Sequence, residues 1–578
     1  MSVPSRLNGA NGNSVEAIPL SRLGRSNREE SAVEVQRLLD RAVEAENKAL
    51  EMDLGTVNTD LDRHYQEEEG GAARAIGEIE PWTGIDNFVR TGGFRNPRGM
   101  SVIVTAMFIV GETAGGGLVA LPIAVANAGL LMGILLIIFG GILCGITGEM
   151  LAMNWIILMI RFSRYRHHCR KPYPEMAARA LGDWAGHTLM IVLNITQFGT
   201  AAVFLLLGAS NTSHLLNGLV DAEIGPCYLT GVLAVFIFPF TLLKSPKDFW
   251  PVIVIAGFTT TIAVVLILLG VYYDQETCLK HAVFTDFKYT AIFMSFGTTM
   301  FAYGGHAAFP TIQLDMLEPH KFSKAVYGAF GFIGMLYLPV SILAAVVYGN
   351  SLQDSVLTSI QTVWIQKLVT LFITLHLILA LTIIFNPINQ DAETWFRIEQ
   401  SFTYKRVLVR GGVMLAVVFA ALTFPSFGPL LDLIGGSTIT MMAIFLPALF
   451  YLILNAKLQK YGPKGTIFEH ITVTEVLAHN TPYRLFICIL SMVAGIVITV
   501  CATYSSYVAM HGDRFKMPCY GEFVQRHLLG YEVPAPAFLN ETAHHGKFYC
   551  CGPDRDISAY GTEFCLDPAL AVAGGSHG

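Results

Sequence analysis

Two apolar stretches of the chain are interrupted by glycine at matching positions. Residues 114–122 read AGGGLVALP, and residues 302–310 read AYGGHAAFP. Aligned without a gap, the two segments share the first alanine, two glycines and the closing proline. Because glycine has no Cβ, it lets a helix open and lets a ligand approach the main chain closely. The pattern predicts two membrane helices that break at corresponding points.

Broken helices in a membrane bare backbone groups that need polar partners. Unwound backbone is tolerated at membrane depth where protein, a polar cavity or a ligand receives it. N–H groups at the start of a half-helix attract a carboxylate, and unwound carbonyls receive an ammonium group. The alternative is that the glycines only permit close helix packing. We predict a site for a zwitterion, with two aromatic walls, formed by Thr113, Ala114, Gly115, Gly116, Gly117, Phe301, Tyr303, Gly304 and Gly305.

Two ionisable residues flank the glycines. Glu112 precedes the first run and His306 follows the second. An ionisable group inside a membrane helix is costly, so both are proton-coupling candidates. The alternatives are a core histidine with satisfied hydrogen bonds, and a Glu112 that faces a cytosolic vestibule or bonds the broken backbone. The spans carry no HExxH motif and no Ser/His constellation, so we expect no enzyme, no catalytic residue, no metal and no cofactor.

The composition places most of the chain in lipid. Of its 578 residues, 53% are hydrophobic and 14% are charged, and the mean hydropathy is +0.50. A spanning helix needs about 20 apolar residues. The sequence predicts an all-α membrane protein with eleven transmembrane helices, at about residues 101–125, 129–160, 187–214, 228–243, 251–273, 289–312, 325–348, 364–387, 406–424, 428–454 and 485–508.

The glycine segments fall in the first and sixth of these spans. Spans one to five and six to ten are therefore interpreted as two halves of an internal repeat. Because each half has an odd number of helices, the two halves must have opposite topology. The predicted fold is a 5+5 inverted repeat with discontinuous helices 1 and 6, followed by an eleventh helix.

Basic residues orient the chain. Lys and Arg gather in the loops after even-numbered spans, whereas the loops after odd-numbered spans hold Lys280 and Lys288. Since cytosolic loops are enriched in Lys and Arg, the N-terminus is predicted to be cytosolic. Three regions follow: a largely disordered N-terminal segment with a short helix (1–97), a transmembrane domain (98–508) and an extracellular or lumenal tail (509–578).

The cysteines support this orientation. Cys227 and Cys278 lie in two loops on the predicted outer side, and four more cysteines lie in the tail. Disulfides persist in oxidising compartments, so we predict a bond between Cys227 and Cys278 and leave open the connectivity of the tail. Free thiols are the alternative. Asn540 begins a glycosylation sequon in the same tail.

Three motifs resemble those of the amino acid/auxin permease family. They are GGGLVALPIAVANAG at 115–129, FAYGGHAAFP at 301–310 and KPYPE at 171–175, and the resemblance covers about residues 98–508. It implies a LeuT-like fold and secondary active transport of amino acids driven by H⁺ or Na⁺. Sodium-coupled members of the family carry an asparagine where this chain has Gly111, so the resemblance points to a proton-coupled, vacuolar-type branch.

The expected function is a proton-coupled symporter for neutral amino acids. The expected location is the plasma membrane or a lysosomal or vacuolar membrane, with a small amino acid and the lipid bilayer as partners and no nucleic acid. Two alternatives remain open. One is an amino acid sensor of the same fold whose residues 1–97 bind cytosolic partners, and the other is a sodium-coupled transporter.

Overall fold

The computed structural model describes residues 96, 99–166, 169, 171–216, 225–242, 250–279, 282, 289–398, 403–463, 465, 469–511 and 518–523. Regular secondary structure in these ranges is helical, apart from an isolated parallel bridge between Met100 and Met316. The predicted N-terminal helix, the Asn540 sequon and the last three tail cysteines lie outside the described residues.

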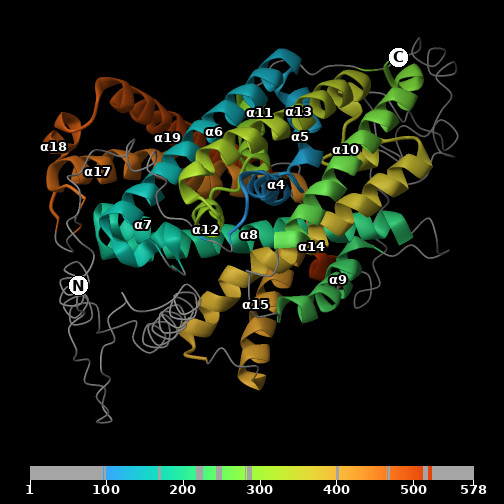
Figure 1. The fold of residues 1–578 in the computed structure, drawn as a ribbon. Coiled ribbons are helices and arrows are strands. Elements are labelled where there is room, and N and C mark those ends of the chain that lie inside the picture. Colours follow the sequence, from blue (N-terminus) through green and yellow to red (C-terminus); the bar gives the residue numbers. More distant parts are fainter. Residues whose placement is uncertain are drawn as a thin grey trace, which may run out of the picture. The chain divides into compact units, whose positions relative to one another are not determined.

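The described residues form a series of helices along the chain (Figure 1). They are α4 (Val102–Thr113), α5 (Leu121–Ala128), α6 (Leu130–Arg161), α7 (Pro172–Leu181), α8 (Asp183–Leu216), α9 (Pro226–Thr241), α10 (Trp250–Cys278), α11 (Tyr289–Ala302), α12 (Phe309–Leu314), α13 (Phe322–Tyr348), α14 (Val363–Trp395), α15 (Tyr404–Thr423), α16 (Phe427–Ile434), α17 (Leu446–Tyr461), α18 (Val473–Ala478), α19 (Pro482–His511) and α20 (Cys519–Phe523).

Helix occupies each of the eleven predicted ranges, but not every helix is long enough to count as a span. Among the described residues, eight helices are long and apolar enough to cross a membrane, or nine if the bent pair formed by α4 and residues 118–128 is one span. Helices α9 and α11 have 16 and 14 residues. The predicted number of eleven spans is therefore larger than the eight or nine that meet this length criterion.

Both glycine segments interrupt helices, as predicted. Helix α4 ends at Thr113, and the chain bends by 54° before α5 continues. Helix α11 ends at Ala302, and α12 begins at Phe309. In both cases a proline lies in the first turn of the following helix, Pro122 in α5 and Pro310 in α12. Proline lacks an N–H group, which the first turn of a helix does not need, so it is well suited to the start of the second half of each broken helix.

Helix α4 lies within the bundle, against α10, α12 and α13 (Figure 1). The other broken helix, α11, packs against α5, α16 and α19. Helices α8, α10 and α14 form a second set of close neighbours beside them. The two breaks are therefore surrounded by long, intact helices that fix their positions.

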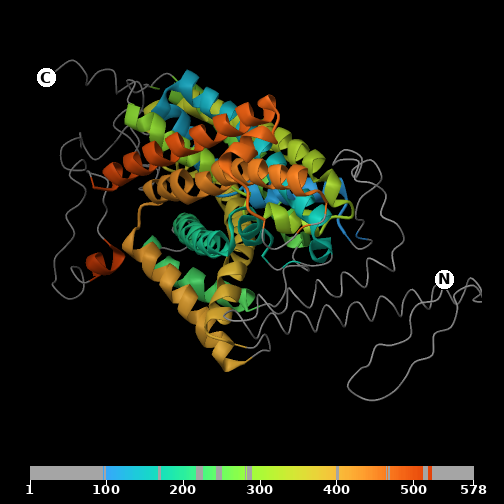
Figure 2. The ribbon, with the colours of Figure 1, turned by 90° about the vertical axis from the view of Figure 1, so that its left-hand side faces the viewer.

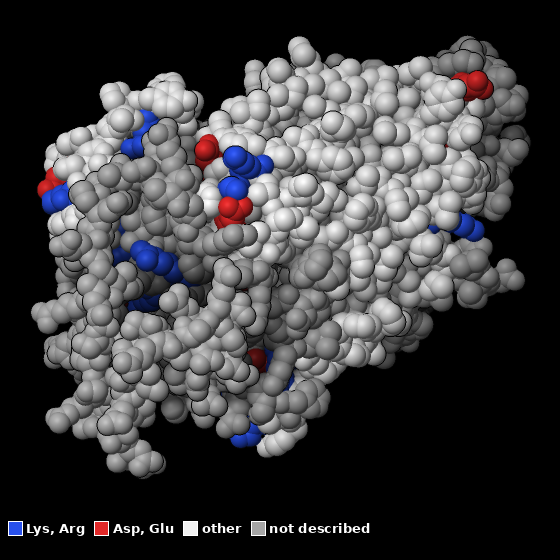
Figure 3. Space-filling model, in the orientation of Figure 1, with Lys and Arg blue, Asp and Glu red and all other residues white. Residues whose placement is uncertain are grey.

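The outer faces of the helices are apolar. Figure 3 shows that most of the described surface on this side carries neither Lys, Arg, Asp nor Glu. On α15 the side chains of Leu408, Leu415 and Phe419 are exposed, and on α19 those of Phe486 and Val500 are exposed. Such a large apolar surface is unfavourable in water, so it is the surface that faces hydrocarbon.

The predicted bond between Cys227 and Cys278 is wrong in this structure. Cys227, at the start of α9, is bonded to Cys519 of α20, with a Cα–Cα distance of 5.7 Å. Cys278 is also disulfide-bonded. The reason lies in packing: α9 lies alongside α15 (Figure 2), and α20 packs on the same helix, with the Phe419 and Tyr520 rings stacked at 6.1 Å. Helix α15 thus brings the tail to α9.

Candidate functional site

The two broken segments touch each other in the interior. A Cβ added to Gly117 would lie 2.5 Å from the Cα of Ala302, and one added to Gly305 would lie 2.6 Å from the Thr113 hydroxyl. Each break therefore packs against the end of the helix that precedes the other break. At Gly117 only glycine allows this approach, because a side chain would push the two backbones apart.

The first break bares backbone donors. The Gly115 N–H donates to the Thr113 carbonyl at 3.1 Å, and the Leu118 N–H donates to the Gly115 carbonyl at 3.1 Å. Within the described residues, the N–H groups of Gly116 and Gly117 find no acceptor. They precede the turn at residues 118–120 that leads into α5, so they lie where a helix attracts an anion.

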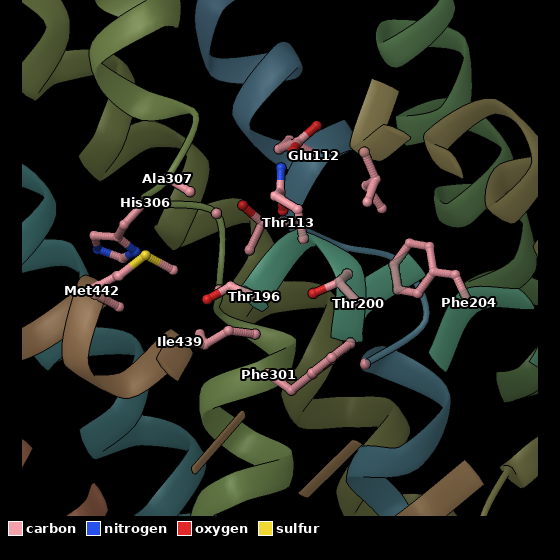
Figure 4. Close-up of a pocket in the computed structure, with 16 residues that line it drawn as sticks. Glu112, Thr113, Thr196, Thr200, Phe204, Phe301, His306, Ala307, Ile439 and Met442 are labelled. Atoms are coloured by element: carbon pink, nitrogen blue, oxygen red, sulfur yellow. The ribbon is translucent and has the colours of Figure 1, made fainter. Parts of the chain in front are cut away.

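A cavity of about 50 Å³ lies beside the breaks (Figure 4). That volume holds a few water-sized groups. Its wall is supplied by α4, α8, α11, α14, both breaks and the helix between α16 and α17. The lining residues are Glu112, Thr113, Gly117, Thr196, Gln197, Thr200, Phe204, Phe301, Gly304, Gly305, His306, Ala307, Ile384, Ile439, Met442 and Ala443.

The structure brings seven of the predicted site residues to the cavity wall and leaves four away from it. Glu112, Thr113, Gly117, Phe301, Gly304, Gly305 and His306 line the cavity, whereas Ala114, Gly115, Gly116 and Tyr303 do not. Gly116 lies one side chain away, because its added Cβ would meet the ring of Phe204 at 2.9 Å. Tyr303 packs away from the cavity, with its ring 5.9 Å from Phe330 and 5.2 Å from Tyr337.

Glu112 and Thr113 form the last turn of α4 at the upper edge of the cavity in Figure 4. The Glu112 carboxylate has no hydrogen-bond partner among the described residues. The Thr113 hydroxyl is buried and likewise finds no partner within them. An unpaired buried hydroxyl is unfavourable, so this pair favours the entry of a polar ligand.

His306 lies across the cavity from Glu112 and is held by α6. Its Nε2 lies 3.0 Å from the Cys144 carbonyl and 3.5 Å from the Thr147 hydroxyl. Since a carbonyl only accepts, we assign the ring hydrogen to Nε2. Nδ1 is then an acceptor, and it is buried without a partner among the described residues. The ring stacks on Phe309 at 4.6 Å.

Sequence reasoning missed the wall from α8. Thr196, Thr200 and Phe204 are spaced by four residues, which places them on one face of the helix. This stripe was the available signal, but threonines in membrane helices often bond their own backbone, as the Thr196 hydroxyl does with the Val192 carbonyl at 2.8 Å. The cavity wall near Ile439 and Met442 was also missed.

His376 on α14 is a second buried histidine at a break, and it too was missed. A Cβ added to Gly115 would collide with its Nε2, so the ring lies directly against the first break. Its Nδ1 lies 3.1 Å from the Ala256 carbonyl and 2.9 Å from the Thr260 hydroxyl, both on α10. The carbonyl assigns the hydrogen to Nδ1. Nε2 is left as an acceptor without a partner in the described part of the chain.

Solved structures align with this chain at low similarity. MhsT in complex with L-phenylalanine aligns with a TM-score of 0.45 and 11% identity, over 70% of this chain and 100% of that chain. A manganese transporter of Eremococcus coleocola aligns with a TM-score of 0.46 and 14% identity, over 78% of this chain and 93% of that chain.

Curated relatives are similar over most of their length. Amino acid transporter AVT1B of Arabidopsis thaliana is 23% identical, over 69% of this chain and 69% of the relative. Lysine histidine transporter-like 1 of the same plant is 25% identical, over 69% of this chain and 88% of the relative.

The family model described as transmembrane amino acid transporter protein matches residues 98–497, which contain both breaks and every residue of the cavity wall. The chain belongs to this family, the amino acid/auxin permease family of transmembrane amino acid transporters.

Proposed function

We propose that the protein is a secondary active transporter that moves a neutral amino acid across a membrane together with H⁺. It works by alternating access, on a fold of two inverted five-helix repeats with discontinuous helices 1 and 6 and an eleventh helix. The observation that carries this proposal is the contact between two breaks that both line one small cavity, with backbone donors bared at the first break.

The chemistry of the breaks suits a zwitterion. The free N–H groups of Gly116 and Gly117 receive the carboxylate, and unwound backbone carbonyls of the breaks receive the ammonium group. The remainder of the wall is apolar or carries hydroxyl and amide groups, with Glu112 and His306 as its ionisable members. A substrate with a neutral side chain fits such a wall without leaving a buried charge unpaired.

The neighbours of Gly111 support H⁺ over Na⁺ as the coupling ion. A Cβ added at Gly111 would collide with the Ile253 carbonyl of α10 and lie 2.8 Å from the Ile253 side chain. An asparagine, the residue that sodium-coupled relatives use there, therefore has no room. Glu112 and His306, which both line the cavity, are the groups proposed to carry the proton.

The proposed orientation has a cytosolic N-terminus and an extracellular or lumenal C-terminal tail. The bond between Cys227 and Cys519 supports it, because disulfides persist on the oxidising side of a membrane. The proposed location is the plasma membrane or a lysosomal or vacuolar membrane. The protein is proposed to act without enzymatic chemistry or a cofactor.

Uptake into liposomes tests the proposal. The purified full chain is reconstituted, and a panel of labelled L-amino acids is offered in sodium-free buffer with and without an imposed pH gradient. We expect concentrative uptake of neutral amino acids that requires the gradient and stops when a protonophore collapses it. Uptake that follows a sodium gradient and ignores pH would identify a sodium-coupled transporter. Binding with negligible flux would identify a sensor, and no uptake under any gradient would refute transport.

A further inference from the structure

The C-terminal ends of the two broken helices meet at one side chain of α13. The Tyr337 hydroxyl lies 2.7 Å from the carbonyl oxygen of Ala302, the last residue of α11. It also lies 3.3 Å from the carbonyl oxygen of Thr113, the last residue of α4. The side chain is fully buried, and its ring lies 5.2 Å from that of Tyr303. One hydroxyl hydrogen therefore stands between two helix ends.

Both carbonyls lie at negative helix ends. The last carbonyls of a helix lack intrahelical donors and carry the partial negative charge of the helix dipole. Among the described residues, the Ala302 carbonyl accepts a hydrogen bond from Tyr337 alone, whereas the Thr113 carbonyl also accepts from the Gly115 N–H. Half-helix C-termini and unwound carbonyls of this kind coordinate coupling cations in membrane transporters.

We propose that the Tyr337 hydroxyl takes the place of a coupling cation between the two breaks. Its positively polarised hydrogen fills the position between the carbonyls that a sodium ion would otherwise fill. The inference rests on the proposed transport function and deepens it. A carbonyl pair that already has a donor needs no cation, so the two helix ends stay together without Na⁺ and the proton is left as the coupling ion.

Removal of this hydroxyl is the direct test. Tyr337→Phe keeps the ring against Tyr303 but leaves the Ala302 carbonyl without a donor and the Thr113 carbonyl with the Gly115 N–H alone, so a small cation should then be able to stabilise the protein. Tyr337→Asn opens more space and offers an amide oxygen as a further ligand. Tyr348→Phe is the matched control, because Tyr348 is a buried tyrosine of the same helix whose hydroxyl donates to Asp274 at 2.6 Å, away from the breaks.

Thermal stability gives a readout that does not depend on transport. Melting of the purified full chain is measured in the chlorides of sodium, lithium, potassium and choline. For the wild type, and likewise for Tyr348→Phe, we expect a melting temperature that does not change among the four salts. Tyr337→Phe or Tyr337→Asn should melt at least about 2 °C higher in sodium or lithium than in choline. Equal melting of both Tyr337 variants in all four salts would overturn the inference.

Uptake of the labelled amino acid panel gives the second readout. We expect the KM of Tyr337→Phe in choline to rise by about tenfold, because a bared carbonyl disfavours the bound arrangement, and to recover in sodium or lithium. A KM like that of the wild type in every salt would overturn the inference and leave transport intact. If the wild type itself shows no uptake, the proposed function fails, and the melting series still decides the role of Tyr337.

Discussion

The imidazole of His376 on α14 lies directly against Gly115, the first glycine of the break in span one. The ring is completely buried, and its Nδ1 is tied to the Ala256 carbonyl and the Thr260 hydroxyl of α10. The first break therefore packs against helices α10 and α14. His376 links these two helices and contacts Gly115. Gly115, Gly116 and Gly117 each pack against a different residue, so their substitutions are expected to have different effects.

Gly115→Ala is expected to disrupt the protein because its Cβ would run into His376. Overpacking of this kind costs about 1–3 kcal/mol. The double variant Gly115→Ala/His376→Ala should recover part of the loss, which a melting comparison of the three proteins will measure. Gly328→Ala is the control, since its Cβ would meet nothing within 4 Å. Equal melting of Gly115→Ala and Gly328→Ala would refute the contact.

Gly116→Ala is expected to change the KM, whereas Gly117→Ala is expected to change the thermal stability. The added Cβ at Gly117 would meet the Ala302 backbone, which cannot move aside, so we expect lower thermal stability. At Gly116 it would meet the end of the Phe204 ring, which lines the cavity and can shift. We therefore expect a raised KM with nearly unchanged melting. The reverse pattern, with Gly116→Ala unstable and Gly117→Ala normal, would contradict these assignments.

Glu112→Gln tests the proton role of the carboxylate while keeping its shape. If Glu112 carries the coupled proton, the variant should still exchange labelled for unlabelled amino acid but lose accumulation driven by a pH gradient. Glu149→Gln is the control, because Glu149 accepts a hydrogen bond from Tyr327 and does not line the cavity. Normal gradient-driven accumulation in Glu112→Gln would exclude the carboxylate as the carrier and leave His306 as the candidate.

The disulfide is directly measurable. Peptide mapping of the non-reduced full chain should recover a cross-linked peptide that joins Cys227 to Cys519, and reduction should separate the two parts. Cys519→Ser should abolish that product. Cys501→Ser, which removes a free cysteine of α19, should leave it in place. A peptide joining Cys227 to Cys278 would restore the pairing expected from sequence and contradict the structure.

The parts of the fold that could be predicted depend on residues that are close together in the sequence. Runs of apolar residues located the helices, and glycine followed by proline located both breaks, because backbone freedom and a missing N–H act where they occur in the chain. The cysteine pairing was not accessible in this way. It depends on α15 carrying the tail to α9, which is a contact between segments that are distant in sequence.

The same distinction between local features and long-range contacts holds for the site. The glycines of the two breaks were recognisable, but Tyr303 turned out to pack between Phe330 and Tyr337, because the sequence shows that a ring is present and not which way it points. His376 carried one available signal, an ionisable residue inside the predicted span 364–387, but the sequence does not show what it contacts. Its importance comes from its position opposite Gly115, on a helix more than two hundred residues later in the chain.

The helix between α16 and α17 contains two π-helical turns, Gly435–Ile439 and Met441–Phe445, which include the cavity residues Ile439 and Met442. A π turn holds one residue more than an α turn, and one residue corresponds to about 100° of rotation about the helix axis. If such a turn tightened to α-helical spacing, everything beyond it would swivel by that angle with the span still continuous. This wall of the cavity can therefore change its helical register without a break in the span, which a regular α-helix cannot do.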